Sequence, residues 1–369
     1  MVTKSVILER YLCRGWSRVR NLLRIPRYLS SWPRICHRLA LMRSYRANAL
    51  SLQRRLIDVR AGVGTRPIIA VSQVVHLGDI VACEPVVRLL RQDHPNAFIV
   101  FALHLNYREL ADTHPDIDHV LPLICISEWA RFAHSPFFDR VVDLNIYGRT
   151  CGLCGEPWHK RDGNNGVTCD NYYHFGNLLQ IYCKSAGVPV PPDGPKVFPR
   201  PEDMEEVDSL GLPECFVALH SGSNESDRRL PPAAWRTVVD HINSRWHLPV
   251  IEIGLEPLLI NSKEGMNVSL CGELSVLQTA EVIRRSALYL GSDSGPAHLA
   301  NAVGAYGIIA LGHYRHFQQY LPFSGSFADP LQSEVLHYDG PLDELPANRI
   351  IKAIDNRLSI VMNFKCKRD

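Results

Sequence analysis

The sequence predicts an α/β protein made of two doubly wound, Rossmann-like domains. Two series of short apolar segments alternate with longer amphipathic segments, a pattern typical of parallel sheets covered by helices. Between the two series lies Pro189-Val-Pro-Pro-Asp-Gly-Pro195, a cluster of turn-forming residues that we interpret as the linker. The length of 369 residues suffices for two domains of ordinary size.

Residues 67–200 form the first series and are the predicted N-terminal domain. Its expected strands are short apolar runs, namely Ile68–Val75, Ala97–Ala102, Val120–Leu123 and Arg140–Leu144. Helices are expected at Ile80–Gln92, around Tyr107–Thr113 and at His174–Ala186. This domain also carries a Cys-rich insert over residues 148–183.

Residues 201–345 form the second series and are the predicted C-terminal domain. The expected strands are Phe216–His220, Val250–Gly254, Leu288–Gly291 and Gly307–Leu311, and the expected helices are Ala233–Arg245, Leu277–Ser286 and Ala297–Val303. Residues 346–369 remain as a final helix and tail. We expect the helix, Pro346–Leu358, to cross back onto the first domain.

The composition indicates a soluble globular protein of the cytoplasm. Hydrophobic residues make up 46% and charged residues 21% of the chain, and no apolar run reaches the roughly 18 residues of a membrane helix. The first ten residues contain a three-residue apolar core and no cleavage site, so we do not expect a secretory signal. Eleven cysteines, mostly scattered singly, suit a reducing compartment better than a disulfide framework.

Residues 1–66 form a basic, helical N-terminal arm. The arm holds fifteen Lys and Arg against two acidic residues, a charge of +13 that leaves −11 for the body in a chain of net +2. Arg10, Arg14 and Arg18 share one helical face, and Trp16 and Trp32 add aromatic anchors. Such a helix is typical of binding to an anionic membrane surface, here the inner membrane. Alternatively, the arm covers the acidic body or joins subunits. Nucleic acid is not an expected partner, because no recognition module is present.

The segment from Ser292 to Gly304 is the most informative part of the chain. It reads as a strand end, a tight turn and a helix that Pro296 begins. The free N–H groups and the dipole of such a helix start attract phosphate, and Ser294, Gly295 and His298 lie there. A carboxylate would repel phosphate, so we expect Asp293 to accept hydrogen bonds from sugar hydroxyls.

Polar residues follow three predicted strands at the point where each strand ends. Asp79, Ser221 and Asp293 all occupy such positions. Ligands of doubly wound sheets bind beyond the carboxyl ends of the strands, so we expect these three residues to line one cleft.

Three stretches resemble the ADP-heptose:lipopolysaccharide heptosyltransferases, glycosyltransferase family 9. Asp293-Ser-Gly-Pro-Ala-His-Leu-Ala-Asn-Ala-Val-Gly304 is similar to the family signature D-[ST]-G-P-x-H-L-A-x-A-x-G, and His76-Leu-Gly-Asp79 resembles its LGD turn. Ser221 to Trp235 resembles its G-…-K-x-W-P-…-W loop, except that Arg228 replaces a common Lys and Leu230 a common aromatic residue. The resemblance covers roughly residues 67–358 and implies the GT-B fold, in which the two domains face a cleft.

The resemblance implies an inverting glycosyltransferase. Such an enzyme would move a sugar, here a heptose, from a nucleoside diphosphate, here ADP-heptose, to lipopolysaccharide or to another glycan, lipid-linked or protein acceptor. Asp79 would be the catalytic base, and its alternative role is a helix N-cap. No cofactor is required for this chemistry.

The expected donor-binding residues follow from the same reading. Arg228, Ser221 and Ser223 are candidates to hold the diphosphate, because a guanidinium can grip two phosphate oxygens. His298 is either a phosphate ligand or a packing histidine, and Glu256 is a weaker candidate for the ribose hydroxyls. Arg229 is the more plausible solvated loop charge of the two arginines.

Two other functions fit the same residues. A nucleotide-sugar epimerase of this fold would need neither a bulky acceptor site nor an arm. A non-catalytic nucleotide-sugar-binding or assembly protein would make use of the insert and the arm, but the presence of Asp79, Asp293 and His298 argues against it.

The insert contains a possible structural metal site. Cys151, Cys154, Cys169 and Cys183 follow the spacing C-x2-C-x14-C-x13-C, which could bind zinc or iron. The second C-x2-C pair of such sites is missing, and Cys183 falls on the apolar face of an expected helix. Reduced, unligated cysteines are therefore the alternative.

Overall fold

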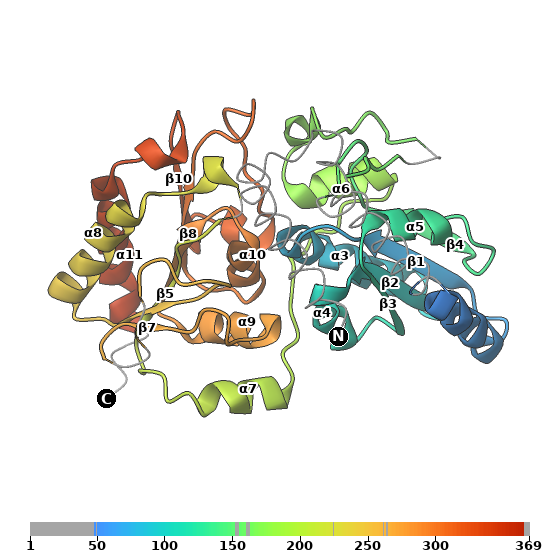
Figure 1. The fold of residues 1–369 in the computed structure, drawn as a ribbon, viewed down its shortest axis with the longest axis horizontal. Coiled ribbons are helices and arrows are strands. Elements are labelled where there is room, and N and C mark those ends of the chain that lie inside the picture. The colour runs from blue at the N-terminus through green and yellow to red at the C-terminus, as the bar shows by residue number, and fades with distance from the viewer. Residues whose placement is uncertain are drawn as a thin grey trace, which may run out of the picture.

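The protein consists of two α/β domains that lie side by side (Figure 1). The structure, a computed structural model, describes residues 48, 50–151, 155–159, 163–223, 225–260, 262 and 265–364. The predicted fold class is confirmed, because both sheets are parallel throughout.

The first domain is built on a four-stranded sheet, within the described residues, of order β3-β2-β1-β4. The strands are β1 (Ile68–Gln73), β2 (Phe98–His104), β3 (His119–Leu123) and β4 (Arg140–Asp143). The helices are α3 (Leu77–Asp93), η2 (Leu105–Tyr107), α4 (Glu109–Asp112), α5 (Ile126–Phe132), η3 (Tyr172–Phe175) and α6 (Leu178–Ala186). Alternate residues of β1 enter cores on opposite faces of the sheet, as expected for a strand covered on both sides.

The second domain is built on a six-stranded sheet of order β10-β9-β8-β5-β6-β7, counted in the described part of the chain. The strands are β5 (Val217–His220), β6 (Val250–Glu252), β7 (Val268–Ser269), β8 (Leu288–Ser292), β9 (Gly307–Leu311) and β10 (Ser333–His337). The helices are α7 (Pro201–Asp208), η4 (Ser226–Arg228), α8 (Pro232–His241), η5 (Ile242–Trp246), α9 (Val276–Arg285), α10 (Gly295–Ala302), η6 (Gly325–Ala328), η7 (Leu342–Glu344) and α11 (Ala347–Phe364).

Two predicted helices differ from the observed ones. The helix expected at His174–Ala186 is divided into η3 and α6, because Gly176 has a φ of +98° and Asn177 begins α6 with a capping box. The helix expected at Ala233–Arg245 is α8 followed by the π-helical turn η5. In both cases the apolar periodicity continues across a local break of the backbone.

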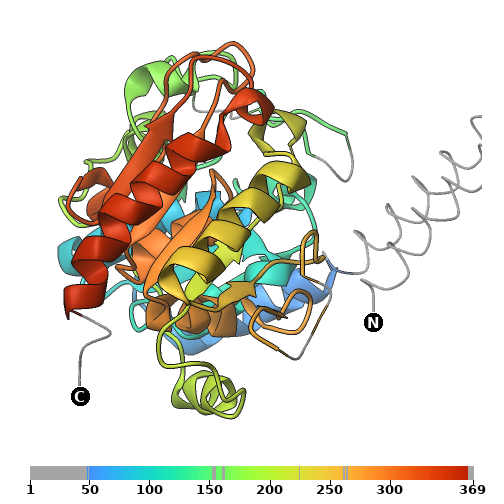
Figure 2. The ribbon, with the colours of Figure 1, turned by 90° about the vertical axis from the view of Figure 1, so that its left-hand side faces the viewer.

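The last helix stays on the second domain. Helix α11 packs against α8, β9 and β10 (Figure 2), and Arg357 donates to the backbone oxygens of Pro330 and Leu331. The expectation that this helix crosses back onto the first domain is therefore wrong. Its apolar face is used on its own domain, where Ile354 and Leu358 are fully buried.

The last part of the basic arm folds onto the first domain. Residues 50–63 are helical, with Leu52 and Leu56 buried against the core beside β1. Arg60 pairs with Asp139 at 2.8 Å. This segment is thus a salt-bridged cover, one of the alternatives for the arm. Residues 1–47 and 49, and with them the expected membrane-binding face, lie outside the described residues.

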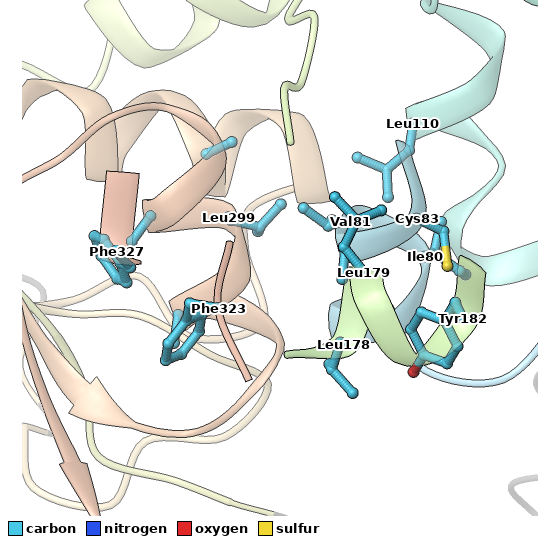
Figure 3. Packing of buried hydrophobic residues seen from close by; sticks show 14 of the residues in the cluster. Ile80, Val81, Cys83, Leu110, Leu178, Leu179, Tyr182, Leu299, Phe323 and Phe327 are labelled. Carbon is cyan, nitrogen blue, oxygen red and sulfur yellow. The ribbon is translucent and has the colours of Figure 1, made fainter. Parts of the chain in front are cut away.

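One hydrophobic cluster continues from the first domain into the second. Val81 of α3 and Leu179 of α6 belong to the same buried cluster as Leu299 of α10 and Phe323 (Figure 3). The two domains therefore meet through packed apolar side chains around α3 and α10. In the part of the chain that the structure describes, no helix has the length and apolarity needed to span a membrane.

Candidate functional site

The two predicted motif turns meet at the junction of the domains. Helices α3 and α10 pack against each other near their first turns. A Cβ atom on Gly78 would lie 2.5 Å from Cδ2 of His298, and one on Gly295 would lie 2.8 Å from Cδ2 of Leu77. Gly78 and Gly295 therefore allow the two motif turns to approach each other closely. This approach brings Asp79 and Asp293 to the junction of the domains.

Asp79 is held by two partners at the start of α3. The carboxylate is 6% exposed, and its Oδ2 lies 2.6 Å from Nη1 of Arg149. The Tyr182 hydroxyl of α6 donates to Oδ1. The N-cap of α3 is His76, so Asp79 does not occupy the alternative capping position.

The surroundings keep Asp79 ionised. Burial raises the pKa of this carboxyl, but Arg149, His76, the Tyr182 hydrogen bond and His298 together lower it by more, so its pKa lies below the usual value. The Asp79 carboxylate is therefore charged at neutral pH.

Asp293 forms a second buried ion pair, in the other domain. Its Oδ2 lies 2.9 Å from Nη1 of Arg228, and its Oδ1 lies 3.7 Å from Nε2 of His298. The Arg228 guanidinium also stacks on Tyr314, 3.7 Å from the ring centroid. Burial raises the pKa of Asp293, but Arg228, His298 and Tyr320 lower it further. Two residues that the sequence assigned to different parts of the donor are thus each other's charge partner.

This second pair leaves polar atoms without a partner. Nε of Arg228 and Nδ1 of His298 are buried and have no hydrogen-bond partner among the described residues. The Nε–H of Arg228 is a donor in every state of the side chain, and a buried donor without a partner is costly unless a ligand or water binds it. This atom favours an acceptor-rich group beside Arg228.

Ser294 occupies the N-cap of α10, yet its side chain does not cap the helix. Its hydroxyl lies 3.0 Å from Nδ1 of His220, at the end of β5. Burial lowers the pKa of His220 to about 4, so this ring is neutral at physiological pH. Gly295, the next residue, begins α10 at the contact with Leu77.

The remaining predicted donor residues occupy different environments. Ser221 donates to the carboxylate of Glu252, which is fully buried and accepts from backbone N–H groups of residues 258–260. Ser223 is half-buried, and its hydroxyl accepts from the backbone of Glu225. Glu256 is exposed in the loop that follows β6. The structural acid Glu252 was missed, although a carboxylate at the end of an apolar strand was a usable signal.

An aromatic cluster covers the two ion pairs, and no sequence pattern indicated it. Tyr172 and Tyr173 of η3 meet Tyr314, Phe317 and Tyr320 of the second domain, with ring centroids 4.6 to 5.3 Å apart for the closest interdomain pairs. All five rings are buried. The cluster comes from the insert on one side and from the loop after β9 on the other, so only the packed domains create it.

His76 connects the two pairs electrostatically. Burial lowers the pKa of its ring, Asp79 raises it, and Arg149 and Arg228 lower it again. The ring therefore experiences charges from both domains, as expected for a residue at their junction.

The cysteines of the insert do not gather in the described structure. Among the described residues, no group of three or more His, Cys, Asp or Glu side chains could hold a metal. Cys183 lies on the buried face of α6, and burial raises the pKa of its thiol to about 12, which disfavours the thiolate that a metal requires. Cys154 lies outside the described residues, so the four-cysteine site stays a prediction. Elsewhere, Cys215 is disulfide-bonded, whereas Cys83, Cys169, Cys183 and Cys271 are free thiols.

Comparison with known proteins gives one match to a protein family. Residues 200–311, which contain the Arg228 loop and the whole of α10, match the model of glycosyltransferase family 9 (heptosyltransferase). The resemblance to glycosyltransferase family 9 is confirmed. No curated protein matches the sequence.

Solved structures with a similar fold include three glycosyltransferases. A glycosyl transferase family 9 protein from Veillonella parvula DSM 2008 has a TM-score of 0.62 at 19% identity, covering 80% of this chain and 98% of that chain. ADP-heptose lps heptosyltransferase II of E. coli has a TM-score of 0.58 at 14% identity, covering 80% and 99%. Dodecameric iron-containing heptosyltransferase TibC, from enterotoxigenic E. coli and in complex with ADP-D-beta-D-heptose, has a TM-score of 0.51 at 13% identity, covering 80% and 77%. At these identities the likeness shows the fold, which is the predicted GT-B architecture of two Rossmann-like domains.

Proposed function

We propose that this protein is an inverting glycosyltransferase that transfers a heptose from ADP-heptose to lipopolysaccharide or to another glycan, lipid-linked or protein acceptor. The family match over residues 200–311 supports the reaction class. The observation that carries the proposal is the junction of α3 and α10, where Asp79 of one domain meets the group of Arg228, Asp293 and His298 of the other.

Asp79 would act as the base from the first domain. As the acceptor oxygen forms its bond to the anomeric carbon, the acceptor's proton passes to the Asp79 carboxylate. The bond between that carbon and the diphosphate breaks at the same time, and its electron pair leaves with the diphosphate oxygen. General-base catalysis of this kind contributes about two to four powers of ten in rate.

The second domain would hold the departing diphosphate. The unpartnered Nε of Arg228 can donate to a phosphate oxygen while Nη1 keeps its 2.9 Å contact with Asp293. The N–H groups and the dipole at the start of α10 add further positive potential. Asp293 then has a role besides the expected contact with sugar hydroxyls, because its charge holds the Arg228 guanidinium in place.

The proposal includes association with a membrane surface through the N-terminal arm. The arm's charge of +13 over residues 1–66 would attract the protein to the anionic inner face of the membrane, where lipid-linked acceptors are made available. The segment that binds the body, residues 50–63, would then link the arm to the catalytic domain.

The variant Asp79→Asn tests the proposed reaction. It removes the proton acceptor with little change in shape, so sugar transfer from ADP-heptose should fall at least about a hundredfold while donor binding stays nearly intact. The matched control is Asp112→Asn, a surface carboxylate of the same domain that pairs with Arg108 at 2.7 Å. Transfer is followed by ADP release, and donor binding by thermal shift. Unchanged turnover in Asp79→Asn would reject the assigned base.

A further inference from the structure

Three separate elements meet at the Asp79 carboxylate. Asp79 belongs to the first turn of α3, Arg149 follows β4, and Tyr182 lies in α6. Arg149 contacts Oδ2 at 2.6 Å, and Tyr182 donates to Oδ1, so each carboxylate oxygen has its own partner. Two contacts on different oxygens fix both the position and the plane of the carboxylate.

Both partners are themselves held in place. The Tyr182 side chain is fully buried, and the Arg149 side chain is 18% exposed. Such preorganised, charge-assisted hydrogen bonds are stronger than neutral ones. A carboxylate has about four lone-pair positions, so these two contacts leave room for a hydroxyl to donate to the same group.

We propose that Arg149 and Tyr182 are positioning residues that hold the Asp79 carboxylate ionised and oriented toward the acceptor hydroxyl. The inference rests on the proposed function, in which Asp79 is the base. Neither residue belongs to the recognised family motifs. The two contacts stabilise the charged carboxylate and so make Asp79 a weaker base. They also keep the carboxylate deprotonated and oriented toward the acceptor hydroxyl.

A pH dependence follows from the groups that face Asp79. These groups are His76 in the preceding loop, Cys83 on the same helix, Tyr107 of η2, Arg149, Tyr182 of α6 and His298 of α10. Removing a contact that lowers the carboxyl pKa must raise it. At acidic pH a larger fraction of Asp79 is then protonated and inactive, so the acidic limb of the rate profile moves to higher pH.

The test measures kcat/KM for sugar transfer from about pH 3 to pH 8 in the parent protein, Tyr182→Phe, Arg149→Gln and Arg149→Lys, because the parent's acidic limb lies below the usual carboxyl pKa. Loss of one charge-assisted hydrogen bond should move the acidic limb upward by roughly one to two pH units. Arg149→Lys keeps the charge but loses the planar fork, so it should move the limb less than Arg149→Gln. The matched control is Tyr107→Phe: Tyr107 experiences the charge of Asp79, but its hydroxyl bonds to the backbone of Leu77.

The outcomes separate this inference from the proposed function. Lower kcat at every pH with an unmoved acidic limb would mean that Tyr182 and Arg149 only support the fold, and the inference would be overturned. The same holds if Tyr107→Phe moves the limb as far as Tyr182→Phe does. Retained turnover in Asp79→Asn would instead overturn the proposed base. Thermal unfolding and ADP binding identify any variant that fails to fold. If Tyr182→Phe or Arg149→Gln fails to fold, the pH profile of Arg149→Lys, the most conservative change, tests the inference.

Discussion

The buried pair of Arg228 and Asp293 offers a direct test of how the proposed donor site is held together. Replacing Arg228 by Met keeps much of the side-chain volume but removes the guanidinium. Asp293 is 3% exposed and would then retain a buried charge without its 2.9 Å partner. Only His298, at 3.7 Å, and Tyr320 would remain to stabilise it.

The magnitude follows from the burial of both groups. Breaking a buried ion pair by removing one partner costs about 3–5 kcal/mol, whereas removing both charges costs much less. For a domain of this size each kcal/mol lowers Tm by roughly 2–4 °C, so Arg228→Met should lower it by roughly 6–20 °C. Arg228→Met combined with Asp293→Asn should recover part of this loss, because no uncompensated charge remains.

The assay is thermal unfolding of the two single variants, the double variant and the parent protein. Arg229→Met is the matched control, since the exposed Arg229 contacts only the backbone oxygen of Ser223 among the interactions described, at 2.6 Å. A loss in Arg228→Met no larger than that in Arg229→Met, or a double variant less stable than the sum of the singles, would refute the reasoning.

The same pair should respond to pH with a definite sign. The pKa of Asp293 is lowered from its ordinary value of 3.8 in the folded protein. Its contribution to stability is therefore present above about pH 4 and is lost as pH falls through the lower folded pKa. The difference in Tm between parent protein and Arg228→Met should shrink in that acidic range.

Two further predictions concern the domain junction and the arm. Gly78→Ala should destabilise the protein by about 1–3 kcal/mol, because the new Cβ would meet His298 at 2.5 Å. The control Gly62→Ala should stabilise the protein slightly, because its Cβ would have no atom within 4 Å and its backbone angle is not a special one. Equal changes in Tm for the two variants would contradict this prediction. A chain starting at residue 48 should fold normally and lose salt-sensitive binding to anionic vesicles. A chain starting at residue 67 should aggregate or unfold at a lower temperature, because it lacks the buried Leu52 and Leu56. Vesicle binding that survives removal of residues 1–47 would exclude that part of the arm as the anchor.

Much of the site could be read from local sequence. Pro296 beside Gly295 predicts a helix start after an apolar strand, and α10 begins there. Asp79 and Asp293 were placed past strand ends, and parallel sheets bring such positions to one edge. These inferences succeed because turn chemistry and strand periodicity depend on near neighbours in the chain.

The partners of those residues could not be read in the same way. Arg149 lies 70 positions from Asp79, and Tyr182 lies 103 positions away, so no local pattern connects them. The assignment of Arg228 to phosphate alone overlooked Asp293, because two opposite charges in separate loops reveal nothing about their distance. A charged side chain that is buried without a partner is strongly destabilising, so it pairs with the nearest opposite charge. The tertiary structure therefore decides whether that partner is a ligand or another side chain.

The sequence by itself determined the two parallel sheets, the motif turns and the resemblance to glycosyltransferase family 9. The tertiary structure alone decided that the glycines of those turns face each other across the domains, that each motif aspartate has its own arginine, and that aromatic rings from the insert and the loop after β9 cover both pairs. The physical reason is range: helix starts and strand edges arise from hydrogen bonds and apolar spacing over a few residues, whereas the ion pairs and the aromatic cover exist only once folding has excluded water between segments that are distant in the chain.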